Sequence, residues 1–227
     1  MDYAFTHQPS YTHLVVDLDP GETVRAEPGA MVSHSAAIDV SASTSRDGIL
    51  KSAKSLFGGE SVFAAEFTAE DEPGRVTLAP GVPGDVQHHD LAGGKLYAVD
   101  GAFLASGPDI DIDAEFGGLK SVLAGASVTP LALSGTGPVF LDAFGGIEQV
   151  DLADGERYIV DNDHVVAWEE TVDFDATLAG GITAAALSGE GLVMEFSGPG
   201  SVWYQTRGRE AFVEAIADLL PDRNGGE

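Results

Sequence analysis

The sequence predicts an all-β domain over residues 1–208, made of three tandem copies of one β unit and followed by a short C-terminal helix. Three observations predict it: short motifs recur in the same order at matching offsets, most apolar runs alternate with polar residues, and glycine or proline turns separate the runs. Alternation with a period of two is typical of strands with one buried face. Many short strands separated by turns are typical of barrels and sandwiches.

The repeat is clearest at an anchor motif, whose copies are Gly29-Ala30-Met31-Val32, Gly101-Ala102-Phe103-Leu104 and Asp163-His164-Val165-Val166. At one fixed offset after the start of each anchor comes an apolar-Asp-apolar triplet, centred on Asp39, Asp111 and Asp173. The units close at Gly74, Gly137 and Gly200, which are evenly spaced along the chain. A unit of this size has too little core to stand alone, so the three must pack together. We place the repeats at about 10–90, 91–153 and 154–207.

Two kinds of segment depart from the β pattern. Apolar residues recur at helical spacing over residues 209–220 until Pro221, which predicts a C-terminal helix packed on the body, with 221–227 as a tail. Similar spacing over 47–58 predicts an amphipathic helix, and glycine-flanked segments at 117–125 and 180–189 occupy the same place in the later units. The apolar residues of these insertions either enter the core or form a patch that faces a partner or a membrane. The partner-binding candidates are Lys51, Lys54, Leu56, Phe57 and Lys120.

Composition limits the partners and the compartment. A net charge of −26, from 37 acidic and 11 basic residues, favours a protein adapted to a salt-rich cytoplasm, where counterions screen the repulsion. An acidic face for basic proteins or divalent cations is the alternative. Nucleic acid and anionic lipid need a basic footprint, which argues against both as partners, and we expect no membrane insertion. The absence of cysteine excludes disulfides and thiolate metal sites.

Several motifs resemble those of the altered-inheritance-of-mitochondria protein 24 family. They are Gly84-Asp85-Val86, the run from Asp100 to Ser106, Gly118-Leu119-Lys120-Ser121, the run from Ser188 to Val193 and the run from Gly198 to Arg207. The resemblance covers about residues 10–207. It implies a fold similar to the trp RNA-binding attenuation protein: three short double-stranded β-helix units in a pseudo-threefold arrangement. It also implies a homotrimer, and it supplies no catalytic residues.

The one dense group of metal-ligand side chains is His88-His89-Asp90. On a strand, His88 and Asp90 share a face and His89 points away, so the group supplies two ligands at most and needs a third, such as His34 or His164. Solvated or hydrogen-bonded histidines are the favoured interpretation. The alternating acids Asp109, Asp111 and Asp113 predict a solvated strand face, because they do not surround a point as calcium ligands do.

No nucleophile motif or phosphate-binding loop is present in the sequence. We therefore expect a non-enzymatic interaction or scaffold module without a cofactor, acting as a homotrimer with an unidentified protein partner. The first alternative is a metal-dependent or small-molecule enzyme with a site between repeats, for which His88, His89 and Asp90 are the candidates. The second is a protein that docks on a membrane-associated partner through its lysine-bearing insertions.

Overall fold

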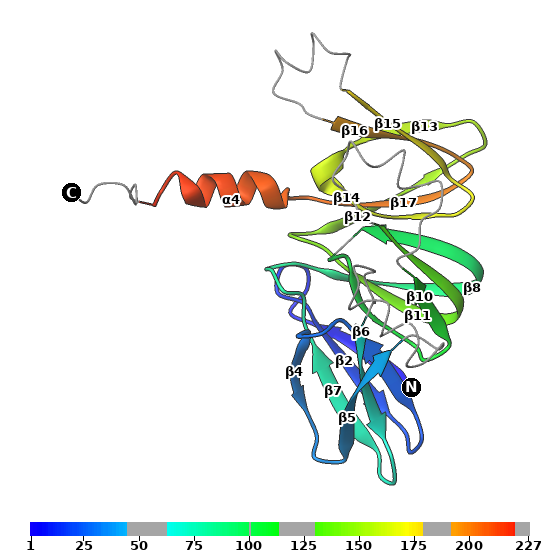
Figure 1. Cartoon of the computed structure of the whole chain (residues 1–227), viewed down its shortest axis with the longest axis vertical. Helices are drawn as coiled ribbons and strands as arrows, with labels where there is room; N and C mark the ends of the chain where they lie inside the picture. Colours follow the sequence, from blue (N-terminus) through cyan, green and yellow to red (C-terminus); the bar gives the residue numbers. More distant parts are fainter. Residues whose placement is uncertain (45–62, 100, 114–129, 179–191, 221–227) are drawn as a thin grey trace, which may run out of the picture.

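The computed structural model describes residues 1–44, 63–99, 101–113, 130–178 and 192–220, and these residues form an all-β body with a helix at the C-terminal end. Figure 1 shows the strands in three groups that follow one another along the longest axis, which we call the first, middle and last thirds. The first third contains β1 Asp2–Thr6, β2 His13–Leu18, β3 Thr23–Ala26, β4 Met31–His34, β5 Ile38–Thr44, β6 Phe63–Ala69 and β7 Gly74–Leu78. The middle third contains β8 Val86–Val99, β9 Phe103–Ser106, β10 Ile110–Asp113 and β11 Pro130–Asp142. The last third contains β12 Ile147–Leu152, β13 Arg157–Asp161, the 3-10 turn η1 Asn162–His164, β14 Val165–Glu169, β15 Asp173–Leu178, β16 Leu192–Ser197 and β17 Gly200–Gln205.

One pairing scheme recurs along the chain, always antiparallel. In the first third, β7 pairs with β2 and β4, while β6 pairs with β3 and β5. In the last third, β17 pairs with β12 and β14, while β16 pairs with β13 and β15. In the middle third, β11 pairs with β8 along its length, with β9 at one end and with β10 at the other. Each third therefore has two half-sheets of equivalent strands.

The middle third differs because two long strands replace four short ones. The chain of β8 turns at Gly93 and Gly94, which have φ of +89° and +79°. Opposite them, the register of β11 shifts at Gly135, whose φ of +129° and close approach to the Asp109 carbonyl leave no room for a side chain. Glycine adopts such φ values without steric cost, so each strand bends and serves both half-sheets.

Two pairings between thirds join the half-sheets. Strand β3 pairs with β9, and the C-terminal part of β8 pairs with β14, so that most strands belong to one ten-stranded sheet. The half-sheet β1-β2-β7-β4 at one end and the half-sheet β13-β16-β15 at the other remain separate. Figure 1 places these two half-sheets at opposite ends of the molecule.

The core consists of three clusters of buried apolar side chains. Phe67 and Phe140 lie in the first, Trp203 in the second, and Trp168 and Phe196 in the third. Leu104 and Phe140 of the middle third belong to the first cluster, so the core continues across the junction between thirds. This continuity fits the expectation that a single unit cannot bury its own apolar face.

The all-β prediction is confirmed, and each anchor and each triplet lies on or beside the expected strands. The predicted repeat boundaries differ from the pairing, because the boundary at 90/91 falls inside β8 and the one at 153/154 falls between β12 and β13. The reason is that the first strand of each third precedes its anchor and has no motif of its own. The double-stranded β-helix geometry and the pseudo-threefold arrangement stay predictions.

The C-terminal helix α4 spans Arg209–Ala217, shorter than the predicted 209–220. The expectation that it packs on the body is wrong: α4 projects from the body in Figure 1 and has no buried residue. Its base alone is held, by the Phe212 ring 5.0 Å from the Phe144 ring and by Arg209, which donates to the Gly101 carbonyl at 2.6 Å. An apolar stripe predicts a helix but does not say what covers it. Among the described residues, none of the helices is long and apolar enough to cross a membrane.

Candidate functional site

The predicted metal-ligand group lies on β8 and is divided between the two faces of that strand. His88 Nε2 is 3.1 Å from Asp90 Oδ1, and the His88 ring lies against Tyr3 and Phe140. His89 points to the other face, where its ring centroid is 5.1 Å from that of Trp203. Burial lowers the pKa of His89, and the negative charge of Glu169 opposes that shift. Alternation along the strand thus leaves two ligands together, as the sequence predicts.

Neither histidine considered as a third ligand joins them. His34 Nδ1 lies 2.9 Å from the Ser35 carbonyl, and His164 Nδ1 lies 2.7 Å from the Gln205 carbonyl. Within the part of the chain that the structure describes, no three His, Asp or Glu side chains form a group suited to a metal ion. The partner-binding candidates Lys51, Lys54, Leu56, Phe57 and Lys120 lie outside the described residues, as do the three insertions.

An open depression of about 490 Å³ lies on the first third beside Asp2, Asp17, Asp19, Ser35 and Arg75. Its cation is already paired, because the Arg75 guanidinium donates to both carboxylate oxygens of Asp17, at 2.6 and 3.0 Å. This hydrogen bonding lowers the pKa of Asp17 and raises that of Arg75. With its positive charge neutralised and acids around it, the depression is poorly suited to an anionic ligand.

Asp142, at the end of β11, is a buried acid that the sequence did not single out. Its side chain is almost wholly buried, and its Oδ1 has no hydrogen-bond partner among the described residues. Burial, together with the negative charge of Glu27, raises the pKa of Asp142 to about 7, while Arg209 opposes the shift. The repeat contains a signal, because Ala79 and Gln205 precede and follow Asp142 at the interval that separates the closing glycines. An acid stands where the other copies have uncharged residues.

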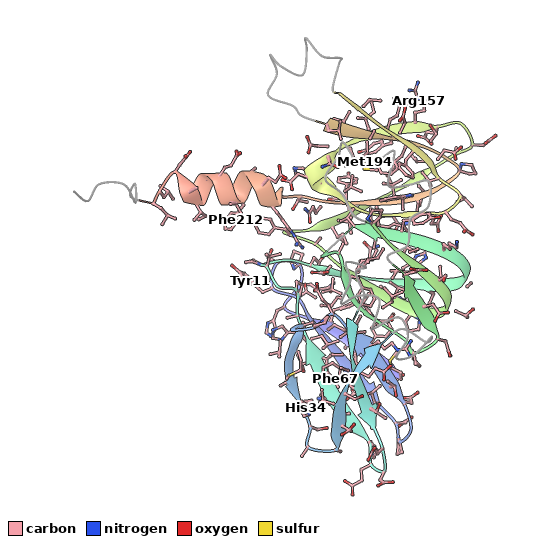
Figure 2. The ribbon with its side chains drawn as sticks, in the orientation of Figure 1. Tyr11, His34, Phe67, Arg157, Met194 and Phe212 are labelled. Atoms are coloured by element: carbon pink, nitrogen blue, oxygen red, sulfur yellow. The ribbon has the colours of Figure 1, made fainter. Side chains whose placement is uncertain are left out.

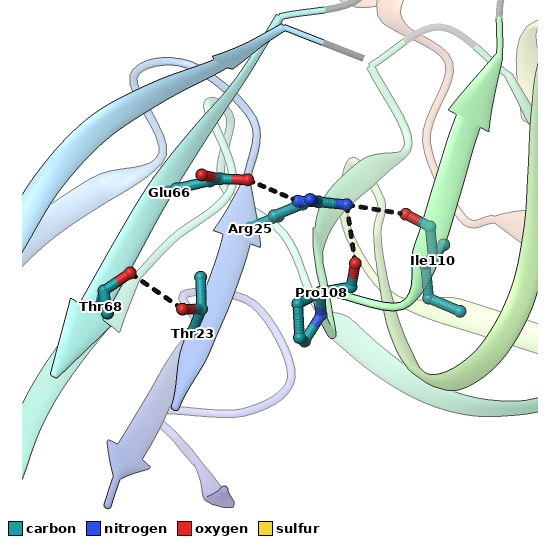
Figure 3. Close-up of polar contacts among 6 residues, drawn as sticks. All are labelled: Thr23, Arg25, Glu66, Thr68, Pro108 and Ile110. Carbon is teal, nitrogen blue, oxygen red and sulfur yellow. Dashed lines mark hydrogen bonds and ion pairs between the residues drawn. The ribbon is translucent and has the colours of Figure 1, made fainter. Parts of the chain in front are cut away.

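The junction between the first and middle thirds is closed by strand pairing and by Arg25. Arg25 pairs in register with Ser106 of β9, and Ala26 with Ala105. Figure 3 shows the Arg25 side chain reaching across the junction: Nε donates to Glu66 at 2.8 Å, and Nη1 donates to the carbonyls of Pro108 and Ile110 at 2.8 and 3.3 Å. One guanidinium therefore joins the two thirds.

The junction between the middle and last thirds repeats this pairing with an aromatic contact. Tyr97 of β8 pairs in register with Trp168 of β14, and Ala98 with Ala167. The Tyr97 and Trp168 rings are 5.6 Å apart, and Trp168 also contacts Phe174 and Phe196. Trp168 is fully buried, so apolar packing closes this junction.

The strands equivalent to those at the junctions lie open at the two ends. Every residue of β9 and all but Glu169 of β14 is buried, whereas all four residues of β4 are exposed, with Met31 43% and Val32 51% accessible. At the other end, Ile159 of β13 is 60% accessible. In Figure 2, His34 of β4 and Arg157 of β13 lie toward opposite ends of the molecule. The molecule therefore ends in two open sheet edges that carry exposed apolar side chains.

Comparison with known proteins finds a matching family model, an uncharacterised relative and a solved structure of similar fold. The family model described as mitochondrial biogenesis AIM24 matches residues 3–207. An uncharacterised protein from Streptococcus pyogenes serotype M6 is 28% identical over 230 residues, covering 97% of this chain and 92% of that protein. An X-ray structure of a Streptococcus pyogenes protein superposes with a TM-score of 0.78 at 27% identity, covering 96% of this chain and 99% of the other.

Proposed function

We propose that this chain, which belongs to the mitochondrial biogenesis AIM24 family, is a non-enzymatic interaction or scaffold module that works as a homo-oligomer. The observation that carries the proposal is the exposure of β4 on both faces, when the equivalent strands β9 and β14 are buried by a strand from the neighbouring third. An exposed sheet edge is a template for pairing with another chain.

The chemistry of the described residues supports an interaction module over an enzyme. The two ligands His88 and Asp90 stay without a third, the depression at Arg75 has its cation paired, and the buried carboxyl of Asp142 does not line that depression. A catalytic site needs a positioned nucleophile, base or metal within reach of a substrate. Exposed apolar residues on the edge strands β4 and β13 instead favour protein association.

The proposed homo-oligomer is a trimer that forms in a salt-rich cytoplasm. Each copy brings a net charge of −26, so association requires screening, and the Debye length falls from about 30 Å at 0.01 M salt to about 3 Å at 1 M. The test is light scattering in multimolar KCl over a range of protein concentrations. We expect a mass about three times the chain mass of 23.5 kDa, falling to that of one chain when KCl is lowered. A single-chain mass at all concentrations in high salt would overturn the proposal.

A further inference from the structure

The two junctions within the chain share one register. Arg25 pairs with Ser106 at the first junction, and Tyr97 pairs with Trp168 at the second. Tyr97 follows Arg25 at the interval from the first anchor to the second, and Trp168 follows Ser106 at the interval from the second anchor to the third. The neighbouring residues obey the same rule, because Ala26 pairs with Ala105 and Ala98 with Ala167. The junction is therefore itself a repeated element.

The receiving strands share an irregularity that marks their equivalence. The register shifts between Met31 and Ser33 in β4, between Phe103 and Ala105 in β9, and between Val165 and Ala167 in β14. A bulge skips one residue at a fixed position in each strand, namely Val32, Leu104 and Val166. Bulges are specific features of a fold, so β4 has the same local shape as the strands that are covered. Leu104 and Val166 are fully buried and Val32 is half exposed.

Strand β13 is the equivalent, in the last third, of β3 in the first third and of the C-terminal part of β8 in the middle third. It pairs with β16 as β3 pairs with β6, in a matching register: Tyr158 faces Phe196 as Val24 faces Phe67. Ile159 therefore occupies the strand position that Arg25 and Tyr97 occupy at the two junctions. Arg25 and Tyr97 each contact the next third, whereas Ile159 is largely exposed to solvent.

We propose that β13 of one copy pairs antiparallel with β4 of a second copy, with Ile159 opposite His34 and Val160 opposite Ser33. This inference rests on the proposed homo-oligomer and names the surfaces that form it. The two open half-sheets, β13-β16-β15 and β4-β7-β2-β1, join by the same pairing that joins half-sheets inside the chain. Within one copy these strands lie toward opposite ends, so a second copy must supply the partner. The contact is head-to-tail, and a rotation that closes on itself produces a ring.

The absence of native cysteine allows a direct crosslinking test. The two single variants Ile159→Cys and His34→Cys are mixed at low salt, returned to multimolar KCl and oxidised. We expect covalent dimers in the mixture and only single chains from each variant alone, because a head-to-tail contact places unlike positions together. Directly opposite residues of antiparallel strands have Cβ atoms about 4.5–5.5 Å apart, close to the spacing that a disulfide spans. The control mixes Ile159→Cys with Ser33→Cys, which lies on the opposite face of the strand.

A second measurement uses mass without a crosslink. Ile159→Lys places a charge in the proposed contact and should reduce the mass in high salt to that of one chain. Val40→Lys, at an exposed apolar position on β5, should leave the mass unchanged. If the native protein is oligomeric but the Ile159–His34 mixture does not crosslink and Ile159→Lys keeps its mass, the β13–β4 contact is wrong and the proposed oligomer survives. If the native protein is a single chain, the proposed function fails with it.

Discussion

The internal junctions and the open ends of this molecule are built from equivalent strands in opposite surroundings. At the positions of Ser33 and His34 on β4, the covered strands have Ala105 and Ser106 on β9, and Ala167 and Trp168 on β14. The polar side chains of Ser33 and His34 are hydrated on β4 when the chain is not associated with another copy. The bulge residue Val32 remains apolar, as Leu104 and Val166 are at the same position. Polar residues and bulges on edge strands reduce indiscriminate pairing. The difference suits an edge that accepts one partner in one register.

The largest effect should come from the junction that apolar packing closes. Trp168→Ala removes a fully buried side chain that contacts Tyr97, Phe174 and Phe196, and should cost about 3–5 kcal/mol of the free energy of unfolding. His34→Ala, at the equivalent position of the open strand, should change it by less than about 0.5 kcal/mol in the single-chain state. The two losses are compared by urea unfolding of both variants in a background that does not associate, such as Ile159→Lys. Equal losses would show that the two strands are equally covered.

Trp168→Phe sharpens the same comparison. The Trp168 indole N–H has no hydrogen-bond partner among the described residues, so phenylalanine keeps most of the packing and removes an unsatisfied donor. We expect Trp168→Phe to lose much less stability than Trp168→Ala. A loss as large as that of the alanine variant would mean that the indole N–H makes a bond that matters.

The second effect concerns Asp142, beside the first junction. Its pKa of about 7 in the folded state lies above its ordinary value of 3.8, so between those values the folded protein binds more protons than the unfolded chain. This group therefore destabilises the fold increasingly as pH rises from about 4 to about 7, and fully above 7. Asp142→Asn should remove that penalty, which is at most about 4 kcal/mol.

The pH dependence is measured as the difference in free energy of unfolding between Asp142→Asn and the native chain. It should grow from pH 4 to pH 7 and then level off. Asp39→Asn, at an exposed acid on β5, is the control and should give a small difference without that rise. A flat difference for Asp142→Asn would mean that the carboxyl has a polar partner or is ionised at neutral pH in the fold.

The third effect tests the polar junction. Arg25→Ala removes the guanidinium that donates to Glu66, Pro108 and Ile110, and leaves a partly buried carboxylate without its cation, which should cost about 1–3 kcal/mol. Arg75→Ala breaks an exposed ion pair with Asp17 and should cost clearly less, because solvent screens that pair. Chemical unfolding in one high-salt buffer compares the two. A loss from Arg25→Ala no larger than that from Arg75→Ala would mean that the junction depends on the backbone pairing of β3 and β9 rather than on Arg25.

Sequence patterns predicted the strands well because each pattern is local. The anchors, the triplets and the closing glycines lie at strands β4, β9 and β14, at β5, β10 and β15, and at β7, β11 and β17. Burial is not local. Met31-Val32 and Val165-Val166 have similar patterns, yet the first pair is exposed and the second is buried, because only β14 has a neighbouring strand from another third.

The same limit applies to the candidate sites. Strand alternation correctly separated His89 from His88 and Asp90, since it depends on the backbone alone. The repeat marks Asp142 as an acid where the other copies have uncharged residues, but burial among 37 acidic residues depends on tertiary neighbours that no local pattern shows. The open edges required the pairing of β3 with β9 and of β8 with β14, which no local motif encodes.

The smallest change in stability should come from substitutions on α4. They test whether the apolar stripe of this helix is covered by the body or by another copy. Val213 and Ile216 of α4 are 63% and 44% accessible, so Val213→Ser should change the free energy of unfolding by less than about 0.5 kcal/mol and leave the oligomer mass unchanged. Phe212→Ala is the matched control, because its ring packs on Phe144, and it should cost about 1 kcal/mol. Urea unfolding and light scattering on the same samples measure both quantities. A fall in mass with Val213→Ser would make α4 part of the contact between copies, and the comparison of junctions and ends would then need a third surface beside β4 and β13.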